Sequence, residues 1–140
     1  MRLNVSILVS ALACVCFAGA AMDRWSALSQ IESGDDDKAV GRMGEISRYQ
    51  ILPDVWTAFA PENAKWENAK DALAVAKAAM KKRRAEFERT YHRAPTDFEF
   101  YVLWNAPAQI DRPGTAVSER AKRFCNLLTR NENLAELPKN

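Results

Sequence analysis

Histidine and cysteine are scarce in this chain of 140 residues, which has one histidine, His92, and three cysteines. Hydrolases of the Ser-His-Asp or Cys-His type need a histidine base beside the nucleophile. Structural zinc sites usually take four Cys or His ligands. The scarcity of both residue types argues against these two classes, and we expect neither a metal nor a cofactor.

A phosphate-binding loop, a calcium loop and an excess of positive charge are also missing. Gly34, Gly41 and Gly44 lack the downstream lysine and serine or threonine of a P-loop. The aspartates at 35–37 are consecutive, whereas an EF-hand needs ligands at alternate positions, so we interpret them as a solvated turn. The formal net charge is only +2, and nucleic-acid-binding domains usually carry a large basic excess. We therefore expect no nucleic-acid partner.

The N-terminal segment differs from the rest of the chain. Arg2 is followed by an uncharged apolar run at 5–17 and by small residues at 18–20. This order is typical of a secretory signal peptide, and the run is shorter than the roughly 20 residues that cross a membrane as a helix. We predict that residues 1–20 are a signal and that the protein works in the periplasm or cell envelope.

Two alternatives stay open for this segment. It could be retained as an anchor, or carry a lipid at Cys14, because Ala11-Leu12-Ala13-Cys14 loosely resembles a bacterial lipobox. Cleavage of the signal would remove Cys14 and Cys16 and leave Cys125 alone, so the mature protein could form no internal disulfide. We expect Cys125 to be buried and inert on a helix.

The remaining sequence predicts one mainly α-helical domain at 22–134, followed by a loose tail at 135–140. Apolar residues recur with helical spacing in several stretches, which capping and turn residues separate. The predicted helices are 23–31, stopped by Gly34; one beginning at Pro53; 62–91; one from Thr96, with Glu99 as capping-box partner, to Asn105; and 118–130. A short irregular or β segment is expected after the first helix, at 45–51.

Two of these helices have patterns that predict their surroundings. Residues 98–104 are apolar on nearly every side, which predicts a buried central helix. Residues 81–84, Lys-Lys-Arg-Arg, point in different directions on a helix, so we interpret them as a solvated face rather than a patch for an anionic polymer. The helix at 62–91 has one apolar stripe with a spacing of seven, formed by Trp66, Leu73, Met80 and Phe87.

Once histidine-dependent and phosphate-binding sites are set aside, carboxylates are the catalytic groups left to an exported protein of this composition. The bond that such carboxylates would most naturally cleave is a glycosidic bond. Cleavage of that bond needs a carboxylic acid that is still protonated near neutral pH. Glu32 falls at the end of the first predicted helix, where the helix dipole disfavours a negative charge. Burial against Trp25, Tyr49 or Trp104 would raise the pKa of Glu32 further. Glu32 is therefore the candidate proton donor.

Three short stretches resemble the signature of lytic transglycosylases of the SLT type, a family that shares the goose-type lysozyme fold. The family pattern is a Glu-Ser at a helix end, a Gly-x-x-Gly-Leu-Met-Gln-Ile segment and an Ala-Tyr-Asn-Ala-Gly helix end. The stretches here are Ile31-Glu32-Ser33-Gly34, Gly44-Glu45-Ile46-Ser47-Arg48-Tyr49-Gln50-Ile51 and Leu103-Trp104-Asn105-Ala106. Their order and approximate spacing agree with the pattern, and the resemblance spans about residues 24–128.

The resemblance implies a lysozyme-like fold and cleavage of the β-1,4 bond between MurNAc and GlcNAc in peptidoglycan. Glu32 would be the catalytic acid and base, and the N-acetyl group of the substrate would attack the anomeric carbon. The product would be a 1,6-anhydro sugar, and no second carboxylate would be needed. The partner would be the peptidoglycan strand, and we expect a monomer. The expected substrate-binding residues are Ser33, Tyr49, Gln50, Trp104 and Asn105.

Departures from the family pattern leave the mechanism open. Ser47-Arg48-Tyr49 replaces Gly-Leu-Met, Trp104 replaces Tyr, and Pro107 replaces Gly. Glu45 is an additional acid, and Glu45 or one of the aspartates at 35–37 could hold a water for inverting hydrolysis. Three functions follow: a lytic transglycosylase, an inverting lysozyme-like hydrolase with Glu45 as second catalytic carboxylate, or an inactive envelope protein that binds glycan.

Overall fold

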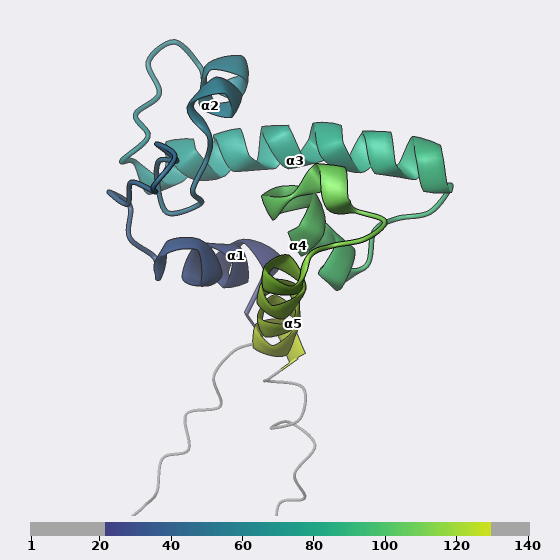
Figure 1. The fold of residues 1–140 in the computed structure, drawn as a ribbon. Helices are drawn as coiled ribbons and strands as arrows, with labels where there is room; N and C mark the ends of the chain where they lie inside the picture. Colours follow the sequence, from purple (N-terminus) through teal and green to yellow (C-terminus); the bar gives the residue numbers. More distant parts are fainter. Residues whose placement is uncertain (1–21, 130–140) are drawn as a thin grey trace, which may run out of the picture.

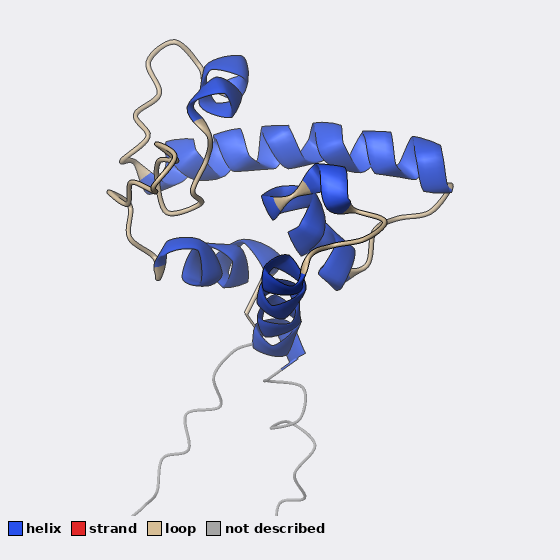
Figure 2. Cartoon of the chain, in the orientation of Figure 1, coloured by secondary structure: helices blue, strands red, loops and turns tan. Residues whose placement is uncertain are grey.

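The computed structural model describes residues 22–129, which form a mainly helical domain (Figure 1; Figure 2). The expected mainly α class is confirmed. The predicted signal at 1–20, Cys14 and the tail at 135–140 lie outside the described residues. No helix within residues 22–129 is long and apolar enough to cross a membrane. The elements are α1 (Arg24–Ser33), α2 (Pro53–Phe59), α3 (Ala69–Tyr91), α4 (Asp97–Asn105), the 3-10 helix η1 (Pro107–Gln109) and α5 (Thr115–Thr129).

The core is built around α4, which packs against both α3 and α5 (Figure 1). Thr96 and Glu99 form the predicted capping box, in which each side chain bonds to the backbone N–H of the other residue. The side chains from Phe100 to Trp104 are all buried, as the apolar composition of this stretch predicted. Helix α1 packs on α5, and α2 packs on α3, so the buried helix is enclosed on several sides.

Helix α1 carries Glu32 in its last turn. Asp23 begins the helix, because its side chain accepts hydrogen bonds from the backbone N–H groups of Trp25 and Ser26. The helix ends where Gly34 adopts a left-handed φ of 69° and its N–H bonds to the carbonyl of Gln30. The predicted stop at Gly34 is therefore confirmed.

The segment between α1 and α2, expected to be irregular or β, is irregular. Ile46 makes isolated antiparallel bridges to Val40 and Ile51. Ser47 and Gln50 have φ values of 68° and 50°, which lie outside the β region. The backbone between the bridges therefore cannot stay extended, and it turns back on itself instead of forming a strand.

Helix α3 begins at Ala69 rather than at Glu62 as predicted. Asn68 caps it by accepting hydrogen bonds from the N–H groups of Lys70 and Asp71, so the residues before Asn68, including Trp66, form turns. Of the remaining members of the predicted stripe, Met80 and Phe87 are buried and Leu73 is partly buried. The buried face of the helix is completed by smaller side chains, those of Ala72, Val75, Ala76 and Ala79.

Helix α5 begins at Thr115, earlier than the predicted Ser118, and buries Ala121 and Phe124. Cys125 is partly rather than fully buried. Burial raises the pKa of its thiol, which favours the protonated form of the sulfur.

Candidate active site

A groove of about 640 Å³ opens between the end of α1, the loop that follows it, the end of α4 and one face of α5. Most of the residues expected for the site line this groove: Glu32, Glu45, Gln50, Trp104 and Asn105. Four guanidinium groups also line it, those of Arg42, Arg83, Arg120 and Arg123. Glu32 and Asn105, which lie on different helices and far apart in the sequence, therefore share one site.

Glu32 is half-buried at the groove, and its environment favours the protonated form. Burial raises the pKa of its carboxyl, and the negative charge of Glu45 acts in the same direction. A hydrogen bond of 2.5 Å from the hydroxyl of Tyr101 to Oε1 opposes this increase, as does the positive charge of Arg120. Burial outweighs both, so the raised pKa expected from the sequence is found.

Tyr101 fixes one oxygen of this carboxyl. Tyr101 is fully buried on α4, and burial together with the charge of Glu32 raises the pKa of its hydroxyl, so it stays a hydrogen-bond donor. Oε2 of Glu32 has no hydrogen-bond partner within residues 22–129 and remains open to the groove. A carboxyl held in this way can donate a proton from Oε2 and later accept one there, which is the requirement for a general acid and base.

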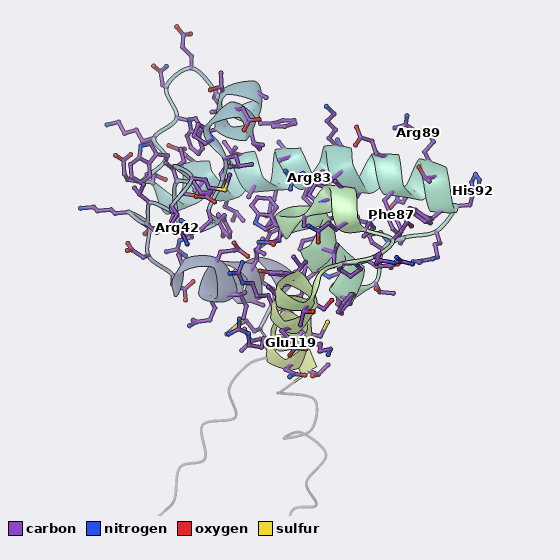
Figure 3. The ribbon with its side chains drawn as sticks, in the orientation of Figure 1. Arg42, Arg83, Phe87, Arg89, His92 and Glu119 are labelled. Atoms are coloured by element: carbon purple, nitrogen blue, oxygen red, sulfur yellow. The ribbon has the colours of Figure 1, made fainter. Side chains whose placement is uncertain are left out.

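Asn105 reaches the groove because it is the last residue of α4. Arg83, on α3 (Figure 3), holds this helix end in place. Its Nη1 donates hydrogen bonds to the carbonyls of Leu103 at 3.0 Å and Trp104 at 2.7 Å. The guanidinium also lies over the Trp104 ring, 5.4 Å from its centroid. The amide of Asn105 is thus carried on a fixed helix end and is available to a ligand.

Trp104 and Tyr49 form the wall behind the groove. Trp104 lines the groove but is only 7% exposed, and its Nε1 donates to the backbone carbonyl of Tyr49 at 3.1 Å. Tyr49 is 4% exposed and does not line the groove. Trp25 contacts both rings edge-on. This aromatic cluster holds the loop after α1 against α4, and Tyr49 contributes to the site through its backbone position.

Glu45 and Gln50 lie together on the loop side of the groove. Oε2 of Glu45 accepts a hydrogen bond from the backbone N–H of Met43 at 2.9 Å, and Nε2 of Gln50 donates to the carbonyl of Ser47 at 3.1 Å. Both side chains pack over Gly41, where an added Cβ would lie 2.3 Å from a Glu45 oxygen and 2.5 Å from a Gln50 oxygen. Gly41 therefore makes room for two of the expected site residues.

Ser33 and the aspartates at 35–37 lie outside the groove. The Ser33 hydroxyl donates to the carbonyl of Arg48 at 2.9 Å and accepts from the N–H of Asp36 at 3.1 Å, so it joins the helix end to the loop. The Arg48 guanidinium pairs with Asp37 at 2.5 Å and with Asp35 at 3.9 Å. Asp35 and Asp37 therefore neutralise Arg48 in the turn. Besides Glu32, the carboxylate that lines the groove is that of Glu45.

The arginines of the groove were missed by the sequence reasoning. Arg83 was interpreted as part of a solvated face, yet its burial lowers the pKa of the guanidinium and its hydrogen bonds hold α4. The spacing of Arg120 and Arg123, three apart on one helix, is a signal that could have placed them on one face. Arg42 lies in an irregular loop, and sequence periodicity does not predict the path of such a loop.

Neither a metal-binding group nor a known relative identifies the function of the groove. Within residues 22–129, no three His, Cys, Asp or Glu side chains come together in a way that could hold a metal ion. No protein-family model, curated protein or solved structure matches the chain.

Proposed function

We propose that this chain is an exported, lysozyme-like glycosidase that cleaves the β-1,4 bond between MurNAc and GlcNAc of peptidoglycan as a lytic transglycosylase. One observation carries the proposal: Glu32, a carboxyl of raised pKa, lies in the same groove as Asn105 and Gln50. These are the residues that the three family-like motifs single out. The proposed place of action is the periplasm or cell envelope, with lipid attachment at Cys14 as an alternative mode of retention.

In this mechanism Glu32 acts twice. Its protonated carboxyl donates to the glycosidic oxygen while the N-acetyl oxygen of MurNAc bonds to the anomeric carbon and the glycosidic bond breaks. The resulting carboxylate then removes the proton of the C6 hydroxyl, whose oxygen displaces the N-acetyl oxygen and forms the 1,6-anhydro ring. The hydrogen bond from Tyr101 stabilises the carboxylate between the two steps. Asn105 orients the acetamido group.

The backbone between α1 and α2 supports the resemblance despite its substitutions. The family pattern has glycine at the positions of Gly44 and Ser47, and both residues have positive φ values here, 82° and 68°. This region of φ favours glycine, and a serine occupies it at some conformational cost. The serine therefore does not imply a different backbone course at this position.

A second candidate is an inverting hydrolase that uses Glu45. Glu45 lines the groove, and its charge raises the pKa of Glu32, so the two carboxyls lie near enough to interact. In that mechanism Glu45 would deprotonate a water that attacks the anomeric carbon while Glu32 protonates the leaving oxygen. The two mechanisms differ in their products, because hydrolysis leaves a reducing sugar end.

The test is digestion of purified peptidoglycan sacculi followed by mass spectrometry of the released fragments. We expect 1,6-anhydro-muropeptides from the wild type, a loss of at least about 100-fold in rate for Glu32→Gln, and a smaller loss for Glu45→Gln. Reducing ends, together with an inactive Glu45→Gln variant, would instead assign the hydrolase. If the wild type releases no fragments and Glu32→Gln binds sacculi as tightly as the wild type, the protein is a glycan-binding protein and the enzyme proposal fails.

A further inference from the structure

We propose that the groove contains an anion-binding subsite, formed by Arg42, Arg120 and Arg123, which takes a carboxylate of the peptide attached to the glycan strand. The identity of the ligand rests on the proposed function. The subsite makes the preferred substrate an acidic, peptide-bearing strand rather than a neutral strand of the chitin type.

The three guanidinium groups come from two separate parts of the chain. Arg42 belongs to the loop after α1 (Figure 3). Arg120 and Arg123 lie three residues apart on α5. All three are exposed to solvent and line the groove. None of them makes an ion pair within residues 22–129. Other arginines of the domain do make such pairs, namely Arg24, Arg48, Arg84 and Arg93.

Positive charge is thus concentrated at the groove of a chain whose overall net charge is only +2. Glu32 and Glu45 face four arginines there. The hydrogen bonds of Arg83 go to the carbonyls at the end of α4. Arg120 lies close enough to Glu32 for its charge to act on that carboxyl, so Arg42 and Arg123 are the groups left most free for a ligand. A cleft lined mainly by one sign of charge concentrates ligands of the opposite sign. Guanidinium groups bind carboxylates through paired hydrogen bonds.

The chemistry of the glycan decides which carboxylate can be the ligand. The lactyl carboxyl of MurNAc is amide-bonded where a peptide is attached, so the sugar backbone there has no free acid. The free carboxylates are those of the peptide itself. A peptide-bearing MurNAc bound beside Glu32 would bring such a group within reach of the groove arginines, whereas a chitin-like strand would leave Arg42 and Arg123 without a partner.

Binding to insoluble sacculi tests the subsite directly. The protein carries Glu32→Gln to prevent turnover, and bound and free protein are separated by sedimentation at fixed ionic strength. Native sacculi are compared with sacculi whose carboxylates have been converted to methylamides. The subsite variant is Arg42→Gln with Arg123→Gln. The matched control is Lys82→Gln with Arg89→Gln, a double substitution that removes the same charge. Both residues are exposed on α3 outside the groove, and Arg89 lies toward the C-terminal end of that helix (Figure 3).

We expect native sacculi to bind about tenfold more tightly than amidated sacculi, the difference that one charged hydrogen-bonded contact supplies. The subsite variant should lose this preference, and the control should keep it. Equal binding to both kinds of sacculi, or an equal loss in both double variants, would overturn the subsite. The subsite and the proposed function can fail separately. If the wild type releases no fragments but binds native sacculi more tightly, the subsite stands and the enzyme proposal fails. If the wild type is active but binds native and amidated sacculi equally, the enzyme proposal stands and the subsite fails.

Discussion

The hydroxyl of Tyr101 donates a hydrogen bond to Oε1 of Glu32 at 2.5 Å, which joins the middle of α4 to the last turn of α1. Tyr101 is fully buried, so its position is set by the packing of α4 against α5 rather than by the groove. The bond holds the orientation of the carboxyl and leaves Oε2 for the groove. It also partly offsets the effect of burial on the pKa of Glu32.

Replacement of Tyr101 by phenylalanine should raise the pKa of Glu32 further, because the carboxylate loses the donor that stabilises it. The protonated form of Glu32 is the active one at the start of the reaction, so the activity of Tyr101→Phe should persist to higher pH than that of the wild type. The free energy of unfolding near neutral pH should fall by roughly 1–2 kcal/mol. The measurements are the pH profile of kcat/KM on sacculi and denaturant unfolding.

Tyr91→Phe is the matched control for this change. The Tyr91 hydroxyl donates to Asp111, away from the groove, so its loss should leave the pH profile unchanged. An alkaline limb that stays in place in Tyr101→Phe, or moves equally in both variants, would contradict the role given to this hydrogen bond.

Glu32 should make the stability of the protein depend on pH in a defined direction. Its pKa is raised in the folded state above the value of about 4.3 expected in the unfolded chain. Between these two values the folded state binds more protons than the unfolded state, so the contribution of Glu32 is fully present below the unfolded pKa and is lost as pH rises through the folded pKa. Subtracting the stability of Glu32→Gln from that of the wild type isolates this contribution from the other carboxyls. A difference that stays flat between pH 4 and 8 would show that burial does not raise this pKa.

Arg83→Met should weaken both the fold and the site. The variant removes two hydrogen bonds to the carbonyls that end α4, and methionine preserves much of the apolar stem. We expect a loss of roughly 2 kcal/mol in the free energy of unfolding and a fall in kcat/KM of about 10- to 100-fold, because Asn105 loses its fixed position. Lys82→Met, at an exposed position on the same helix, should change neither quantity. Wild-type activity in Arg83→Met would show that the end of α4 does not need this support.

Gly41→Ala should impair the groove without unfolding the protein. The added methyl group displaces only the flexible ends of the Glu45 and Gln50 side chains, so the thermal midpoint should stay close to that of the wild type while kcat/KM falls by about 10-fold or more. Gly44→Ala is expected to do the opposite: its thermal midpoint should fall, while its kcat/KM should stay close to that of the wild type. Its φ of 82° strains any other residue by about 1 kcal/mol, but the nearest atom to the new Cβ is 3.9 Å away and belongs to Pro53. Equal activity of Gly41→Ala and the wild type would remove Glu45 and Gln50 from the mechanism.

Local chemistry explains what could be predicted from the sequence. The stop at Gly34, the capping box of Thr96 and Glu99, and the burial of residues 100–104 depend on side chains within a few positions of one another. The position of Glu32 at a helix end follows from the same kind of rule. The late start of α3 was missed because the apolar stripe appeared to continue through Trp66, whereas the cap at Asn68 decides where the helix begins.

Tertiary structure decided which polar groups meet. Tyr101 bonds to Glu32, Arg83 bonds to the end of α4, and Arg42 lies at the same groove as two arginines of α5. No pattern near these residues in the sequence predicts these contacts. The aspartates at 35–37 are prominent in the sequence but lie outside the groove, where Asp35 and Asp37 pair with Arg48. Helix caps and apolar periodicity act over a few residues, so the chain itself sets them. The pKa of a carboxyl and the partner of a guanidinium depend on burial and on charges from distant segments, and only the packing of the helices determines those.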